Sequence, residues 1–103
     1  MSTTEGQHAR HRLDELIHAP VRLSIVAALA QVDEAEFARV RDTVEVSASV
    51  LSKQATQLEA AGYVKIRKGH VGKRPRTWLS LTPAGRSAYT SHLDALRAIA
   101  EGL

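Results

Sequence analysis

Apolar residues recur with a helical period through the first half of the chain and predict three short helices. The first helix spans Arg12–His18, and the second spans Val21–Gln31 after Pro20, a residue suited to the first position of a helix. A connector at Asp33–Ala35 has room for a very short strand, and the third helix spans Glu36–Val44. Leu13, Leu16 and Ile17 share one face of the first helix. The apolar residues of the second and third helices expected to face the core are Ile25, Ala28, Leu29, Phe37, Val40 and Val44.

A fourth helix is predicted after Ser47, whose hydroxyl group suits the N-cap, and it ends at Ala61–Gly62 because glycine is favoured just past a helix. Leu51, Ala55 and Leu58 recur at helical spacing, so they face the core. The outward face has one cation and several short hydrogen-bonding side chains: Ser49, Lys53, Thr56 and Gln57, flanked by Val50. Such side chains pair with base edges in a DNA groove. The alternative is a plain amphipathic helix, which would have the same apolar stripe toward the core.

Strict alternation then replaces the helical period and predicts a β-hairpin. Val64 and Ile66 alternate with cations in the first strand, and Gly69 and Gly72 are expected to frame the tip. In the return strand one face is formed by Thr77, Leu79 and Leu81 and the other by Trp78 and Ser80. We expect Trp78 to pack against a neighbouring helix rather than to stack on the cations of the first strand.

A long final helix is predicted from Pro83 to about Glu101, because Thr82 and Pro83 suit the N-cap and first helical positions. A small core covers only part of its apolar stripe and of the first helix, so packing both across a two-fold axis would bury them in a homodimer. The alternative is a monomer in which the last helix folds back on its own domain. The predicted dimer residues are Leu13, Leu16, Ile17, Tyr89, Leu93, Leu96, Ala100 and Leu103.

The length of 103 residues, 44% of them hydrophobic, fits one compact domain with a small core. We expect a flexible N-terminal arm at residues 1–11 and one domain at residues 12–103. The absence of cysteine excludes disulfides, thiolate metal ligands and a catalytic thiol. No segment has the pattern of a signal peptide or a membrane span, so we expect a soluble, cytoplasmic protein with no membrane partner.

Positive charge is concentrated in the second half of the chain. Residues 1–46 contain 5 Lys or Arg and 8 Asp or Glu, whereas residues 47–92 contain 8 and 1. The stretch Lys65–Arg76 has cations and no acid, although a loop that serves only solubility usually mixes the two signs. This distribution predicts a surface that binds a polyanion, with a solvated basic loop as the alternative.

No pattern in the chain predicts catalysis or a bound cofactor. Gly69–Arg74 only superficially resembles a phosphate-binding loop, because the first spacing is short, an arginine replaces the hydroxyl residue and a strand follows. No hydrolase elbow, zinc-protease motif or carboxylate pair is present, so an enzyme is not expected. The histidines are not spaced as metal ligands, and no metal is expected: they are His8, His11, His18, His70 and His92.

Three segments resemble winged helix-turn-helix transcriptional regulators of the MarR, PadR and ArsR kind, above all the short stand-alone regulators. They are IHAPVRLSIVAAL at residues 17–29, SASVLSKQATQLEAAGYV at 47–64 and GKRPRTWLSLTPAGR at 72–86. The resemblance implies a mostly helical α+β fold, a winged helix-turn-helix with a two-stranded β-wing and a long C-terminal helix. It also implies that the helix after Ser47 enters the major groove, that the wing at Gly69–Arg76 lies along the backbone or minor groove, and that a homodimer binds two-fold operators.

The leading hypothesis is a homodimeric, sequence-specific repressor of transcription that binds double-stranded DNA. The predicted DNA-binding residues are Ser47, Ser49, Val50, Ser52, Lys53, Gln57, Lys68, Lys73, Arg74 and Arg76. The cations would neutralise phosphates, and the exposed helix face would contact base edges. The sequence does not show whether a small-molecule effector exists; if one does, its pocket is expected in the groove between the N-terminal helices and the last helix.

Other classes of function stand as alternatives. A winged helix that binds an acidic protein partner needs apolar anchors on its outward helix face, where only Val50 qualifies. An RNA-binding winged helix needs a stacking platform, and the chain has only four aromatic residues. An enzyme has no candidate constellation.

Overall fold

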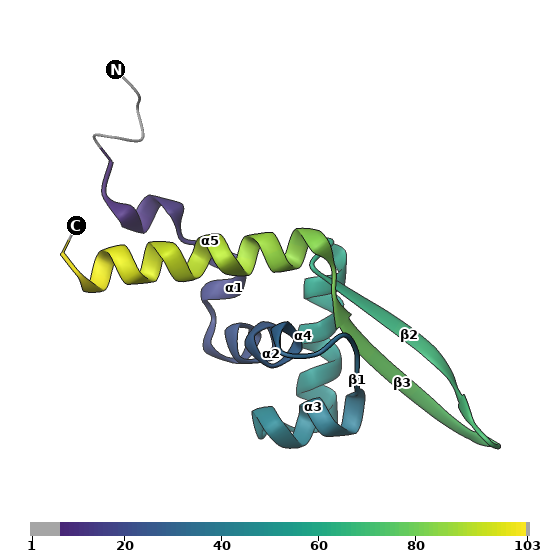
Figure 1. Cartoon of the computed structure of the whole chain (residues 1–103). Helices are drawn as coiled ribbons and strands as arrows, with labels where there is room; N and C mark the ends of the chain where they lie inside the picture. The colour runs from purple at the N-terminus through teal and green to yellow at the C-terminus, as the bar shows by residue number, and fades with distance from the viewer. Residues whose placement is uncertain (1–6, 103) are drawn as a thin grey trace.

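The computed structural model of the chain describes residues 7–102 and has a mostly helical α+β fold. Its elements are η1 (a 3-10 helix, Ala9–Arg12), α1 (Glu15–His18), α2 (Pro20–Ala30), β1 (Ala35–Glu36), α3 (Phe37–Val44), α4 (Ala48–Ala60), β2 (Val64–Val71), β3 (Arg74–Leu81) and α5 (Pro83–Ala100). The β2–β3 hairpin projects from one end of the body and the C-terminal part of α5 from the other (Figure 1). The expected winged helix-turn-helix fold is confirmed.

The core lies where α2, α3 and α4 meet the inner face of the sheet. The stripe predicted for α4 is confirmed, since Leu51, Ala55 and Leu58 are buried. On α2 the buried positions include Val26, whereas Ala28, which was expected in the core, is only half-buried. The difference arises because α2 contacts several elements, including α3, α4, α5 and β3, rather than presenting one narrow face.

The hairpin is longer and its turn tighter than expected. β2 and β3 pair in antiparallel register up to Val71 and Arg74, which leaves only Gly72 and Lys73 in the turn. Gly72 has φ +62°, a conformation that favours glycine. Gly69, expected at the tip, instead lies inside β2, where an added Cβ would approach the Trp78 ring at 3.1 Å. β1 pairs with β3 and completes a three-stranded sheet in the order β1-β3-β2.

The first predicted helix is shorter than expected. Asp14 is its N-cap and accepts hydrogen bonds from the backbone N–H groups of Leu16 and Ile17, so α1 begins at Glu15 rather than at Arg12. Residues 9–12 form η1, which packs against α5 with Ala9 buried. Part of the arm expected at residues 1–11 is therefore helical and packed, and residues 1–6 lie outside the described part of the chain.

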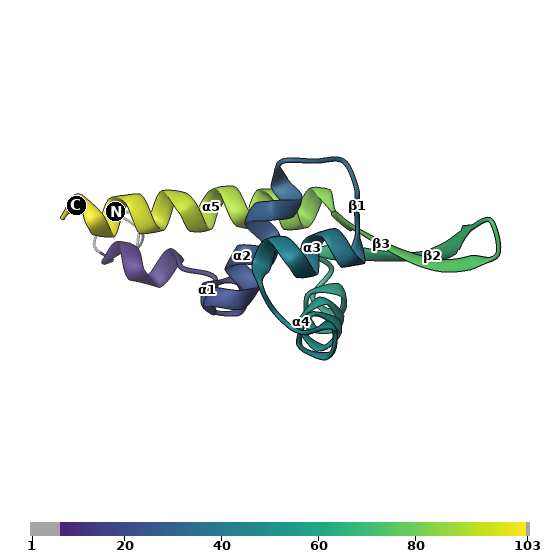
Figure 2. The ribbon, with the colours of Figure 1, turned by 90° about the horizontal axis from the view of Figure 1, so that it is seen from below.

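The start of α5 is fixed against the start of β2. Thr82 is the N-cap, as expected, and its Oγ1 accepts a hydrogen bond from the Gly85 N–H at 2.9 Å. From there α5 runs past the body, accompanied at its far end by η1 (Figure 2).

In the described part of the chain, no helix combines the length and the apolar character needed to span a membrane.

Candidate nucleic-acid interface

The outward face of α4 is accessible along its length. The residues on and beside this helix that were predicted to contact DNA are all exposed: Ser47, Ser49, Val50, Ser52, Lys53 and Gln57. Ser47 caps the helix, and its Oγ accepts a hydrogen bond from the Val50 N–H at 3.2 Å. The helix therefore presents hydroxyl groups, one ammonium group and one amide to solvent, on a backbone that the core fixes from behind.

Gln57 is held by a residue that the sequence did not single out. Arg22 of α2 donates from Nη1 to Oε1 of Gln57 at 3.0 Å and to Oε1 of Gln54 at 2.8 Å. The Nε–H of the same guanidinium donates to the Leu16 carbonyl. Arg22 is the only charged residue of α2, so a lone cation in the most apolar helix was the available signal.

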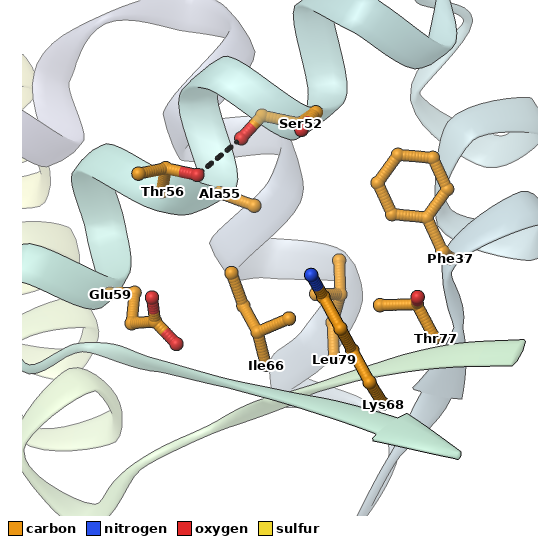
Figure 3. A pocket seen from close by; sticks show the side chains of 9 residues that line it. All are labelled: Phe37, Ser52, Ala55, Thr56, Glu59, Ile66, Lys68, Thr77 and Leu79. Atoms are coloured by element: carbon orange, nitrogen blue, oxygen red, sulfur yellow. Dashed lines mark hydrogen bonds between the residues drawn. The ribbon is translucent and has the colours of Figure 1, made fainter.

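A groove of about 670 Å³ separates α4 from the hairpin (Figure 3). Its deeper walls are apolar, with Ala55, Ile66 and Leu79. Phe37 of α3 and polar side chains from both sides line the rest; the polar residues are Ser52, Thr56 and Glu59 from α4, and Lys68 and Thr77 from the sheet. The amine of Lys68 is directed from β2 toward α4, so Lys68 belongs to the same surface as the helix face (Figure 3).

The cations of the wing do not all have the same freedom. Lys68, Lys73 and Arg74 are exposed, and Lys73 lies in the turn itself. Arg76 is half-buried and its Nη1 lies 3.7 Å from a carboxylate oxygen of Glu36. Among the residues that the structure describes, its buried Nε has no hydrogen-bond partner. Arg74 and Lys73 are therefore better placed than Arg76 to meet a phosphate.

On the face of the sheet turned away from α4, Arg67 is held in place by contacts with Trp78 and Glu34. Arg67 lies over the Trp78 ring, with its Cζ atom 4.0 Å from the ring centroid. Its Nε and Nη2 donate to the two carboxylate oxygens of Glu34 at 2.9 and 2.7 Å, and this hydrogen bonding lowers the pKa of Glu34. The expectation that Trp78 packs against a helix is wrong, because the register sets Arg67 directly opposite it.

The predicted dimer residues are only partly available. Ile17 is fully buried within the protomer, so its assignment to a dimer contact is wrong. Leu16 and Tyr89 are half-buried against the core. Leu13, Leu93 and Leu96 are half-buried and Ala100 is exposed, whereas Leu103 lies outside the described residues.

His92 of α5 is fully buried and joins α5 to α1. Its Nδ1 accepts a hydrogen bond from the Asp14 N–H at 3.0 Å, and its Nε2 lies 3.5 Å from Nδ1 of His18. The Asp14 carboxylate also accepts a hydrogen bond from the Tyr63 hydroxyl at 2.6 Å. Burial, and secondarily the nearby His18, lowers the pKa of His92. These contacts connect α1, α5 and the start of the hairpin.

A second cavity, of about 800 Å³, lies between η1 and the junction of α1 with α2. Its lining includes Arg10, His11 and Leu13, but no residue of α5, so it only partly matches the groove where an effector pocket was expected. The effector stays a prediction.

Between residues 7 and 102, no three side chains of the metal-binding types come together in a possible metal site.

Solved structures with the same fold include transcriptional regulators. A transcriptional regulator homologue from Pyrococcus horikoshii is similar with a TM-score of 0.84 at 26% identity, over 92% of this chain and 95% of that one. A MarR-family regulator from Silicibacter pomeroyi gives 0.67 at 26% identity, over 88% of this chain and 60% of that one. YusO from Bacillus subtilis gives 0.73 at 22% identity, over 91% and 66%. No curated protein matches the sequence.

The match at the level of the family covers most of the body. The family model for the winged helix DNA-binding domain matches residues 21–100, which run from the second residue of α2 to the end of α5. This range contains the whole of α4, the hairpin and the groove between them. The chain therefore belongs to the winged helix DNA-binding domain family, in the fold of MarR-like transcriptional regulators.

Proposed function

We propose that the chain is a homodimeric, sequence-specific transcriptional repressor whose α4 enters the major groove of double-stranded DNA. The observation that carries the proposal is the exposed face of α4, which lies across one groove from the basic hairpin. A helix fits the major groove, where hydroxyl, amide and ammonium groups pair with base edges. Lys53, at the centre of this face, and Gln57 one turn later would reach the same groove.

The hairpin would serve as the wing and lie against the phosphate backbone or in the minor groove. Lys73 and Arg74 are exposed at its tip. The hairpin points away from the C-terminal part of α5 (Figure 1). Lys68, with the hydroxyl groups of Ser52 and Thr56 across the groove, would meet a phosphate between helix and wing. Neutralising phosphates releases counterions, so these contacts would supply affinity that is independent of sequence.

Dimerisation would come from the end of the molecule opposite the wing. There α5 and η1 extend beyond the α1–α4 body (Figure 2). Apolar side chains in the second half of α5 are partly exposed, among them Leu93 and Leu96. A two-fold axis at this end would set two copies of α4 on one face of a duplex. Two half-sites one helical turn apart, about 34 Å, suit such a dimer.

Selection of bound sequences from random duplex DNA tests the proposal. We expect enrichment of an inverted repeat whose half-site centres lie about 10 base pairs apart. Absence of any enriched sequence, with equal binding to an acidic polypeptide, would instead support a protein-interaction module. Repression is then tested by placing the selected site across a promoter: added protein should lower transcription in vitro, and an increase would identify an activator.

A further inference from the structure

The hydrogen bond between Arg22 and Gln57 fixes which way round the Gln57 amide faces. A guanidinium group has five N–H donors and no acceptor, so the amide atom that it contacts must be the oxygen. Nη1 of Arg22 lies 3.0 Å from Oε1 of Gln57. The amide NH2 group of Gln57 therefore lies on the side away from Arg22, where it can only donate.

Arg22 is itself held in place, so this orientation is not easily reversed. Its Nη1 also donates to Oε1 of Gln54 at 2.8 Å, and its Nε–H donates to the Leu16 carbonyl. The side chain is half-buried between α2 and α4. Flipping the Gln57 amide would turn its NH2 group toward the N–H of Arg22, so that two donors would face each other. It would also lose a charge-assisted hydrogen bond, which is stronger than a neutral one.

The orientation bears on which base Gln57 contacts. An unconstrained glutamine typically pairs with adenine through both amide atoms, accepting from N6 and donating to N7. Guanine presents two acceptors in the major groove, N7 and O6, and thymine presents O4. A glutamine whose oxygen is already turned to an arginine is best matched to these acceptors.

We infer that Arg22 is a specificity-determining positioning residue, which commits Gln57 to donate and so selects guanine or thymine over adenine at the base that Gln57 contacts. The inference rests on the proposed function, because it requires α4 to lie in a major groove. Arg22 acts through Gln57 and needs no contact with the DNA itself.

Selection from random duplexes with variant proteins tests the inference. Gln57→Ala first identifies the base pair that Gln57 contacts, because this variant should lose the base preference at that pair and keep the preferences elsewhere. The unaltered protein should select guanine or thymine at that position. Arg22→Met removes the guanidinium group but keeps an unbranched side chain, and adenine should then gain about fivefold, the ratio that one hydrogen bond of about 1 kcal/mol supplies.

Gln57→Glu gives an independent readout that keeps Arg22 intact. The carboxylate would still accept from Arg22, but it has no donor, so the preference should move to bases with a major-groove donor, cytosine N4 or adenine N6. Arg86→Met is the matched control, because it removes a guanidinium group that donates to the Ala30 carbonyl and leaves the bond between Arg22 and Gln57 intact. Its selected sequence should equal that of the unaltered protein.

Three results would overturn the inference while leaving the proposed function standing. These are adenine as the selected base in the unaltered protein, no position that depends on Gln57, and an unchanged preference in Arg22→Met. If Arg22→Met does not fold, the direction of change in Gln57→Glu decides. Failure of the unaltered protein to enrich any sequence would remove the proposed function itself, and this inference with it.

Discussion

Gly85 lets the first turn of α5 approach the backbone at the start of β2. A Cβ added at this position would lie 2.1 Å from the Tyr63 carbonyl oxygen, which also accepts the Thr82 N–H at 3.0 Å. Helix propensity alone predicts that Gly85→Ala stabilises the protein by about 1 kcal/mol. The clash reverses the sign, and we expect a loss of about 3 kcal/mol in the free energy of unfolding.

Urea unfolding followed by circular dichroism measures this effect. Ser87→Ala is the matched control, because Ser87 is exposed on the same helix and its change should stay within about 0.5 kcal/mol. A Gly85→Ala protein at least as stable as the unaltered one would show that the joint between β2 and α5 adjusts without cost.

Wing arginines are expected to differ in their contribution to the salt dependence of DNA binding. The slope of log K against log salt is negative, and Arg74→Ala should reduce its magnitude by about 0.9, the value of one phosphate contact. Arg76→Ala should reduce the magnitude by less than half of that, because Glu36 already pairs with Arg76 at 3.7 Å. Binding titrations across a salt series measure both slopes.

Arg97→Ala is the control for that series, since Arg97 lies on α5 beside Asp94 and away from the wing. An equal change in Arg97→Ala would mean that overall charge, rather than the wing, sets the slope. A smaller change in Arg74→Ala than in Arg76→Ala would contradict the assignment of the tip as the phosphate contact.

Contacts between side chains far apart in the sequence were the part of the site that could not be predicted. The exposure of Lys53 and Gln57 could be predicted from helical spacing, because the apolar residues of the same helix determine which of its faces points to the core. The bond from Arg22 to Gln57 joins residues 35 positions apart, and the pair of Glu34 with Arg67 joins residues 33 apart. Such pairs depend on how elements dock, which periodicity does not specify.

The elements themselves were predictable where a local signal marks each boundary. Ser47, Thr82 and Pro83 begin helices as expected, because caps and proline act within one turn. The tip of the hairpin was misplaced because Gly69 resembles a turn residue, although its role is to leave room for Trp78. The start of α1 differs from the prediction because the Asp14 side chain caps the helix at Glu15.

The joint between α1 and α5 is expected to make stability depend on pH. His92 has a pKa below its usual value of 6.5 because it is buried, and its Nδ1 must stay unprotonated to accept the Asp14 N–H. The unfolded chain binds a proton near pH 6.5 that the folded chain does not. The free energy of unfolding should therefore fall as the pH is lowered through 6.5 and level off below the folded pKa.

Urea unfolding between pH 5 and pH 8 measures this dependence, and His92→Asn is the informative variant. Asparagine keeps an acceptor near the position of Nδ1 but does not titrate, so the part of the slope below pH 7 that is due to His92 should vanish. An equal slope in His92→Asn would assign the dependence to groups other than His92.

On the scale of the whole molecule, an elongated shape separates two surfaces. The extents are 60 × 23 × 21 Å, with the wing at one end and the far end of α5 at the other. A helix of 18 residues is about 27 Å long, so α5 reaches well past the body that holds its first turns. The proposed DNA-binding surface and the proposed dimer contact therefore do not compete for the same residues.

A homodimer through α5 and η1 is the last prediction. At micromolar concentration, sedimentation equilibrium should give twice the 11.2 kDa mass of one chain. Leu93→Glu with Leu96→Glu should yield a folded monomer that has lost affinity for the inverted repeat but keeps contact with a single half-site. The reason is that carboxylates on this stripe would be buried against a second copy, whereas a monomer leaves them in water.

The matched control is Ser87→Glu with Ser91→Glu, which adds the same charge at exposed positions of α5. Circular dichroism checks that each variant retains its helices before its mass is measured. Dimerisation through this end requires the control pair to stay dimeric while the leucine pair does not. An unaltered protein that sediments as a monomer and still binds its inverted repeat, with no effect of either pair, would refute the dimer and leave each wing and helix to act alone.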